Sequence, residues 1–72
     1  MLTALERHRT YIIGLGDERR ELLYIGRHWP DDHPPLFQFQ DLESGEVVEF
    51  LMPQLTALEQ QGALVFGSKH IG

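Results

Sequence analysis

Apolar and polar residues alternate along the chain in a pattern that predicts strands joined by short turns. Residues 10–28 hold two β-prone segments separated by a polar stretch that a glycine opens, which is typical of a hairpin with a few extra loop residues. Apolar residues also follow one another in these segments, as in Ile12 with Ile13 and Leu22 with Leu23. Such pairs indicate strands that are covered on both faces, as in a small barrel or a sheet under a helix.

A second hairpin is predicted over residues 36–52. Its first strand alternates cleanly, with Phe37 and Phe39 on one face and glutamines on the other, and a turn around Gly45 leads into the return strand. The stretch before it, residues 29–35, contains three prolines. Because proline removes a hydrogen-bond donor and favours extended backbone in the preceding residue, we expect a stiff loop there.

Helical signals flank the two hairpins. Thr3 and Glu6 have the spacing of a capping box, which predicts a short helix within residues 1–9. Residues 53–61 begin with a proline, carry leucines at helical spacing and precede Gly62, a residue type that commonly follows the end of a helix. The sequence therefore predicts a second helix over residues 53–61.

A fifth strand is expected at residues 63–67, followed by a tail over residues 68–72. Five short strands with a helix before the last one is also the order of SH3-like small barrels. We therefore expect one small domain over residues 1–72, mainly β or α+β, folded as an SH3-like five-stranded antiparallel barrel. An open antiparallel sheet with one helix packed across it is the alternative.

Composition narrows the classes of function. With 72 residues and no cysteine, the chain has a thin core without disulfides, so homodimer formation is the remaining way to reinforce it. Little room is left for an enclosed catalytic pocket, so we expect no enzyme and no cofactor. Because there is no membrane-length apolar run and no secretory signal pattern, we expect no membrane partner and a cytoplasmic location.

Acidic residues concentrate in the second part of the chain. Residues 31–72 hold seven acids and one lysine, whereas residues 1–30 hold five arginines and four acids. We predict one acidic patch that, together with an exposed tryptophan, binds a protein partner with a basic surface. The predicted partner-binding residues are Asp31, Asp32, Asp41, Glu43, Glu46, Glu49 and Trp29. Alternatively, the acids keep an edge strand soluble, and Trp29 folds back as a lid over the open end of the barrel.

The leading hypothesis is a non-enzymatic, acidic protein-binding module that acts as a free-standing regulator or inhibitor. A phage or mobile-element inhibitor of a nucleic-acid-binding enzyme is one version of it. Affinity would come from an exposed aromatic residue or from an added strand at a sheet edge. The alternative is a small barrel that binds single-stranded nucleic acid, which requires an exposed aromatic residue beside arginines. The net charge of −5 and the acids near Phe37 and Phe39 disfavour it.

A third hypothesis is a small metal-dependent enzyme. His28, Asp31, Asp32 and His33 lie within six residues and could supply nitrogen and oxygen ligands to a divalent ion. A solvated polar loop explains the same residues without a metal. We therefore predict no metal site, and keep these four residues as the only candidates for one.

Overall fold

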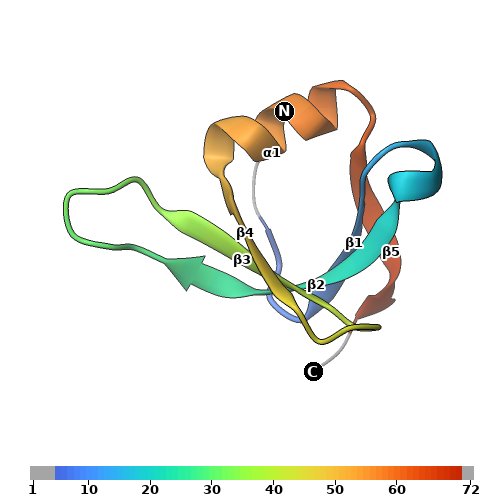
Figure 1. Cartoon of the computed structure of the whole chain (residues 1–72), viewed down its shortest axis with the longest axis horizontal. Coiled ribbons are helices and arrows are strands. Elements are labelled where there is room, and N and C mark those ends of the chain that lie inside the picture. Colours follow the sequence, from blue (N-terminus) through green and yellow to red (C-terminus); the bar gives the residue numbers. More distant parts are fainter. Residues whose placement is uncertain (1–4, 71–72) are drawn as a thin grey trace.

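The computed structural model describes the backbone of residues 5–70 and the side chains of residues 5–67. Within these residues, five strands form a single antiparallel sheet in the order β4-β3-β2-β1-β5, and one α-helix packs against it (Figure 1). The elements are β1 (Arg9–Ile13), a 3₁₀ turn η1 (Gly16–Glu18), β2 (Arg20–His28), β3 (Leu36–Asp41), β4 (Val47–Leu51), α1 (Met52–Gln60) and β5 (Leu64–His70). A mainly β fold with a helix before the last strand is thereby confirmed.

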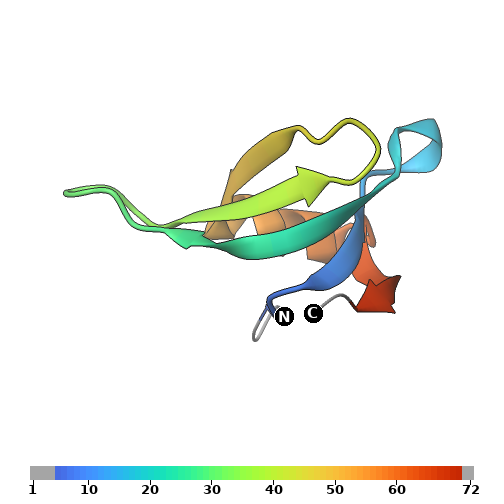
Figure 2. The same ribbon diagram turned by 90° about the horizontal axis from the view of Figure 1, so that it is seen from below.

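The sheet is open rather than closed into a barrel. Strands β4 and β5 form its two edges and do not pair with each other. Helix α1 contacts both edge strands and bridges the open side of the strongly bent sheet (Figures 1 and 2). The SH3-like barrel is therefore not confirmed, and the alternative of an open sheet under one helix describes the fold.

The core lies between the inner face of the sheet and α1. Phe39 is 0% exposed and packs against the rings of Tyr11, Tyr24 and Phe50 at centroid distances of 6.0, 5.2 and 5.7 Å. The predicted sharing of one face by Phe37 and Phe39 is confirmed, since both are buried. The buried core residues are Tyr11, Ile13, Leu22, Tyr24, Phe37, Phe39, Leu55 and Leu64.

The predicted helix before the last strand is confirmed, and its C-terminus has a simple local cause. Gly62 adopts φ +74°, a left-handed conformation that glycine accepts without strain. The Gly62 N–H donates to the Glu59 carbonyl at 3.0 Å, and the Ala63 N–H donates to the Leu58 carbonyl at 2.7 Å. These two bonds satisfy carbonyl groups at the helix end and turn the chain into β5.

The predicted N-terminal helix is wrong for residues 5–9, while residues 1–4 lie outside the described residues. His8 has φ +67°, which a right-handed helix does not allow. The backbone N–H groups bond elsewhere, from Glu6 to the Tyr11 hydroxyl at 2.9 Å and from His8 to the Tyr24 carbonyl at 2.9 Å. A helix this short gains little on its own, so these contacts with the sheet decide the conformation.

The predicted end of the last strand also needs correction. Strand β5 continues to His70, which pairs with Arg9 of β1, so residues 68–70 are strand rather than tail. Residues 71–72 lie outside the described residues. Pairing with β1 extends the strand further than its apolar residues alone indicate.

Strands β2 and β3 form a long hairpin that carries the proline-rich loop outward. Their pairing runs from Leu22 with Asp41 to His28 with Leu36, whereas β1 pairs with β2 only from Arg20 to Leu23. The loop of residues 29–35 therefore projects away from the rest of the molecule (Figures 1 and 2). The loop of residues 29–35 and the turn after β3 therefore lie at opposite ends of β3.

Candidate functional site

The predicted acidic residues fall into two separate groups. Asp31 and Asp32 lie in the projecting loop before β3, whereas Glu43 and Glu46 lie in the turn after β3. The six residues of β3 span roughly 20 Å at the usual rise of a strand. The prediction of one patch containing all the acids is therefore wrong, because strand pairing holds β3 extended between them.

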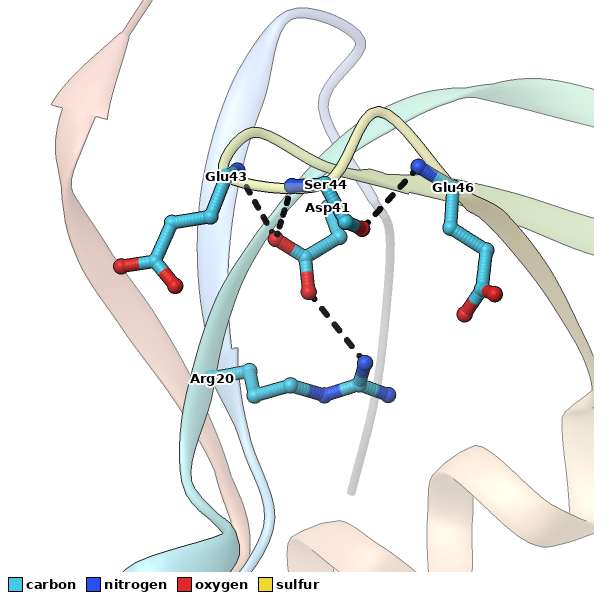
Figure 3. Close-up of polar contacts among 5 residues, drawn as sticks. All are labelled: Arg20, Asp41, Glu43, Ser44 and Glu46. Carbon is cyan, nitrogen blue, oxygen red and sulfur yellow. Dashed lines mark hydrogen bonds and ion pairs between the residues drawn. The ribbon is translucent and has the colours of Figure 1, made fainter.

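Asp41 lies at the end of β3 and fastens the β3–β4 turn. Its side chain is nearly buried, with the residue 6% exposed. One carboxylate oxygen accepts from the N–H groups of Glu43 and Ser44 at 2.9 and 3.4 Å, and the other is 3.2 Å from Nη1 of Arg20 (Figure 3). Both oxygens are thus engaged inside the protein, so the geometry gives Asp41 a structural task.

Three other predicted residues remain on the surface of this hairpin. Glu43, Glu46 and Glu49 are exposed, and no described residue forms an ion pair with Glu43 or Glu46. The Glu46 N–H donates to the Ser44 hydroxyl at 3.2 Å, and the carboxylates of Glu43 and Glu46 point away from Asp41 (Figure 3). Glu49 accepts from the Gln38 amide at 3.0 Å.

The same hairpin carries a sheet edge and exposed apolar side chains. Strand β4 pairs with β3 on one side only, so it ends the sheet. Val47 and Leu42 are 47% and 42% exposed beside the three glutamates. We call these residues the acidic hairpin: Leu42, Glu43, Glu46, Val47 and Glu49.

Trp29 is exposed at the base of the projecting loop. Its exposed fraction is 64%, so the interpretation of this residue as a lid over the core is wrong. Trp29 is not part of the core, whose inner face is filled by Phe39 and its aromatic neighbours. The guanidinium carbon of Arg27 lies 5.5 Å from the centre of the Trp29 ring, a cation–π contact.

The four candidate metal ligands are not gathered into a site. Within the described part of the chain, no group of three or more His, Cys, Asp or Glu residues is arranged to hold a metal ion, and His28, Asp31, Asp32 and His33 are no exception. The Nδ1 atom of His33 lies 2.7 Å from the carbonyl of Pro34 in its own loop. The loop backbone therefore spreads these side chains instead of converging them.

A cluster around Tyr24 was not predicted as a site from the sequence. Burial raises the pKa of the Tyr24 phenol, while the guanidinium groups of Arg27 and Arg7 lower it in part. Arg7 donates from Nη2 to the Ile25 carbonyl at 3.4 Å. In the sequence, the run Arg27-His28-Trp29 indicates that a basic and an aromatic side chain lie close together. The position of Arg7 beside β2 is not visible in the sequence, because it depends on how the sheet folds.

The chain matches no protein family, no curated protein and no solved structure. In the described part of the chain, no helix has the length and apolar character needed to cross a membrane. The chemistry of the acidic hairpin and of the cluster around Tyr24 is therefore what indicates a function.

Proposed function

We propose that the protein is a non-enzymatic binding module whose acidic hairpin engages a protein partner with a basic surface. The observation that carries the proposal is the position of Glu43, Glu46 and Glu49 on the hairpin that ends the sheet. Carboxylates in this arrangement attract a basic partner and speed its encounter. The exposed edge of β4 then offers backbone groups to an added strand.

Apolar contacts supply affinity that charge alone does not. Val47 and Leu42 are both partly exposed next to the glutamates, so alternate side chains of a bound strand can pack on them. An extended segment with alternating basic and apolar residues fits this surface. Proteins that hold nucleic acid on a basic surface belong to the same partner class, so the proposal includes an inhibitory role.

The turn that presents the glutamates is held in place before a partner arrives. The bonds from Asp41 to the turn, together with the bond from the Gly45 N–H to the Asp41 carbonyl at 2.7 Å, fix its backbone. A surface that is already ordered loses less conformational entropy on binding. Asp41 therefore contributes to binding through the shape of the turn.

The test uses a peptide of alternating lysine and valine as the probe and a glutamate–valine peptide as its control. We expect the lysine peptide to shift the backbone amide resonances of β4 and the turn. Reversing two charges with Glu46→Lys and Glu49→Lys should weaken binding by about tenfold or more, because like charges then face each other.

The matched control places the same charge change in the projecting loop before β3. Asp31→Lys with Asp32→Lys alters the net charge equally but leaves the acidic hairpin intact. We expect this variant to bind the lysine peptide almost as the original protein does. Equal weakening in both variants, or amide shifts confined to the loop of residues 29–35, contradicts the proposal.

A further inference from the structure

Exposed arginines and the only tryptophan lie just before β1 and at the end of β2. Arg27 packs over the ring of Trp29, and Arg7 reaches the β2 backbone at Ile25. Both guanidinium groups act electrostatically on the Tyr24 phenol. We call these four residues the arginine–tryptophan face: Arg7, Tyr24, Arg27 and Trp29.

A β-bulge in β2 brings Tyr24 and Arg27 to one side of the sheet. Residues three apart in a regular strand point to opposite faces. Here Tyr24 pairs with Phe39 and Arg27 pairs with Phe37, and the register shifts between Tyr24 and Gly26. Because Phe37 and Phe39 both face the core, their partners share that side of the sheet.

Gly26 lets Arg7 approach the bulge. A Cβ atom at this position would lie 3.3 Å from Nη2 of Arg7, and the residue adopts φ +145°, which side chains rarely allow. The absence of a side chain therefore leaves space for the guanidinium group beside the β2 backbone. The bulge and the glycine together place the Arg7 guanidinium group against the β2 backbone at Ile25 and Gly26, between Tyr24 and Arg27 in the strand.

The positive charges on this face lack carboxylate partners among the described residues. Arg9 and Arg20 lie 3.4 and 3.2 Å from Glu6 and Asp41, respectively, whereas Arg7 and Arg27 form no ion pair with a described residue. These two arginines lack a partner although the chain contains eleven acidic residues and only six lysines and arginines. Two uncompensated guanidinium groups beside an exposed indole are suited to a ligand that is both anionic and planar.

We propose that the arginine–tryptophan face binds single-stranded nucleic acid. The indole of Trp29 stacks on a base, and Arg27 and Arg7 bind neighbouring phosphates. Asp31 and Asp32 lie further along the loop and repel phosphates, so the bound strand runs from Trp29 towards Arg7. An acidic peptide would satisfy the arginines but would leave the exposed ring of Trp29 without a planar partner.

The probe is a fluorescein-labelled oligothymidylate of about ten nucleotides, a length that small nucleic-acid-binding barrels cover. Trp29 is the only tryptophan, so quenching of protein fluorescence reports directly on stacking at this site. We expect quenching with a dissociation constant of about 10⁻⁵ M, and binding that weakens steeply as salt is added.

Variants assign the binding to individual side chains. Trp29→Ala should weaken binding about tenfold, measured by fluorescein anisotropy, while Trp29→Phe retains most of it because a phenyl ring still stacks. Arg27→Gln should weaken binding several-fold and reduce the slope of log affinity against log salt by about 0.7. Asp31→Asn with Asp32→Asn should strengthen binding, since it removes nearby negative charge.

The matched control is Arg19→Gln, which removes the same charge at the exposed loop between η1 and β2. We expect it to leave the affinity and the salt slope close to those of the original protein, and thermal unfolding should show that all variants remain folded. Absence of tryptophan quenching, or equal effects of Arg19→Gln and Arg27→Gln, overturns the inference. Tighter quenching by an oligoglutamate peptide than by the oligonucleotide also overturns it, in favour of an acidic protein partner.

This inference does not depend on the proposed role of the acidic hairpin. The two binding tests use different probes, and the variants expected to weaken binding also differ. They are Glu46→Lys with Glu49→Lys in the first test, and Trp29→Ala or Arg27→Gln in the second. Failure of the lysine–valine peptide to bind therefore leaves the nucleic-acid test intact, and the reverse also holds.

Discussion

The two ends of strand β3 present opposite chemistry. The end that leads into the turn carries Glu43 and Glu46, whereas the end next to the projecting loop lies beside the arginine–tryptophan face. Glu49 lies between these ends, opposite Gln38. Arg19 and Arg20 both lie near the turn, and Arg20 is paired with Asp41. Arg7 and Arg27 have no carboxylate partner among the described residues. A net charge of −5 conceals this separation, so the location of charge says more about partners than its sum does.

The two surfaces also differ in how they are held. Backbone hydrogen bonds and the Asp41 carboxylate fix the acidic hairpin, so its geometry depends on one turn. The arginine–tryptophan face depends on the bulge in β2 and on contacts between residues far apart in sequence. Changes to the turn should therefore disturb one surface without the other.

The largest effect is expected from Phe39→Ala, which should abolish both surfaces together. Phe39 is fully buried within β3, between Tyr24 of β2 and Val48 of β4, and replacing it with alanine leaves a cavity in a small core. We expect a loss of about 3 kcal/mol or more in the free energy of unfolding, measured by urea denaturation, and a largely unfolded chain near body temperature. Trp29→Ala is the control, with a change within about 0.5 kcal/mol because the ring is exposed. A well-folded Phe39→Ala protein contradicts the assigned core.

A smaller effect, confined to the acidic end, is expected from Asp41→Ala. The substitution removes the acceptor for two turn N–H groups and the partner of Arg20. We expect about 1 to 3 kcal/mol lower free energy of unfolding and weaker binding of the lysine–valine peptide. Asp31→Ala, in the exposed loop, should change stability by less than about 0.5 kcal/mol. Equal destabilisation by both variants would show that the turn does not depend on Asp41.

The smallest effect concerns the pH dependence contributed by Tyr24. Burial raises the pKa of its phenol, against the opposing influence of Arg27 and Arg7, so the folded chain holds the proton more tightly than the unfolded chain does. The contribution of Tyr24 is therefore constant below about pH 10, and the free energy of unfolding falls as pH rises above it. Tyr24→Phe should remove the part of the alkaline decrease in the free energy of unfolding that Tyr24 causes, as measured by urea denaturation.

Arg27→Gln should raise the phenol pKa further, as measured by ultraviolet absorbance titration. An unchanged alkaline profile in Tyr24→Phe, or a lowered phenol pKa in Arg27→Gln, contradicts the assigned environment.

Much of the fold follows from short-range patterns. Alternation around Phe37 and Phe39 identifies β3 and its buried face, and the successive leucines at Leu22 and Leu23 indicate burial on both faces of β2, as observed. Gly62 marks the end of α1. Residues 5–9 are the exception, because hydrogen bonds to Tyr11 and Tyr24 outweigh a weak local preference for helix.

The candidate surfaces were predictable only in part. Exposure of Glu43, Glu46 and Glu49 follows from their place in and after a polar turn, and their separation from Asp31 and Asp32 follows once β3 is extended. Burial of Asp41 follows from the same alternation, because Asp41 shares the inner face of β3 with Phe37 and Phe39, but its ion pair with Arg20 depends on the neighbouring strand. Sequence composition likewise cannot decide whether the only tryptophan packs inside or outside.

The sequence by itself determined the strands, their inner faces and the helix before the last strand, because side-chain periodicity and turn residues act over a few neighbouring positions. Tertiary structure alone decided that the sheet stays open and that Arg7 joins Tyr24, Arg27 and Trp29. Those outcomes depend on strand register and on the bulge at Gly26, which arise from pairing between distant segments.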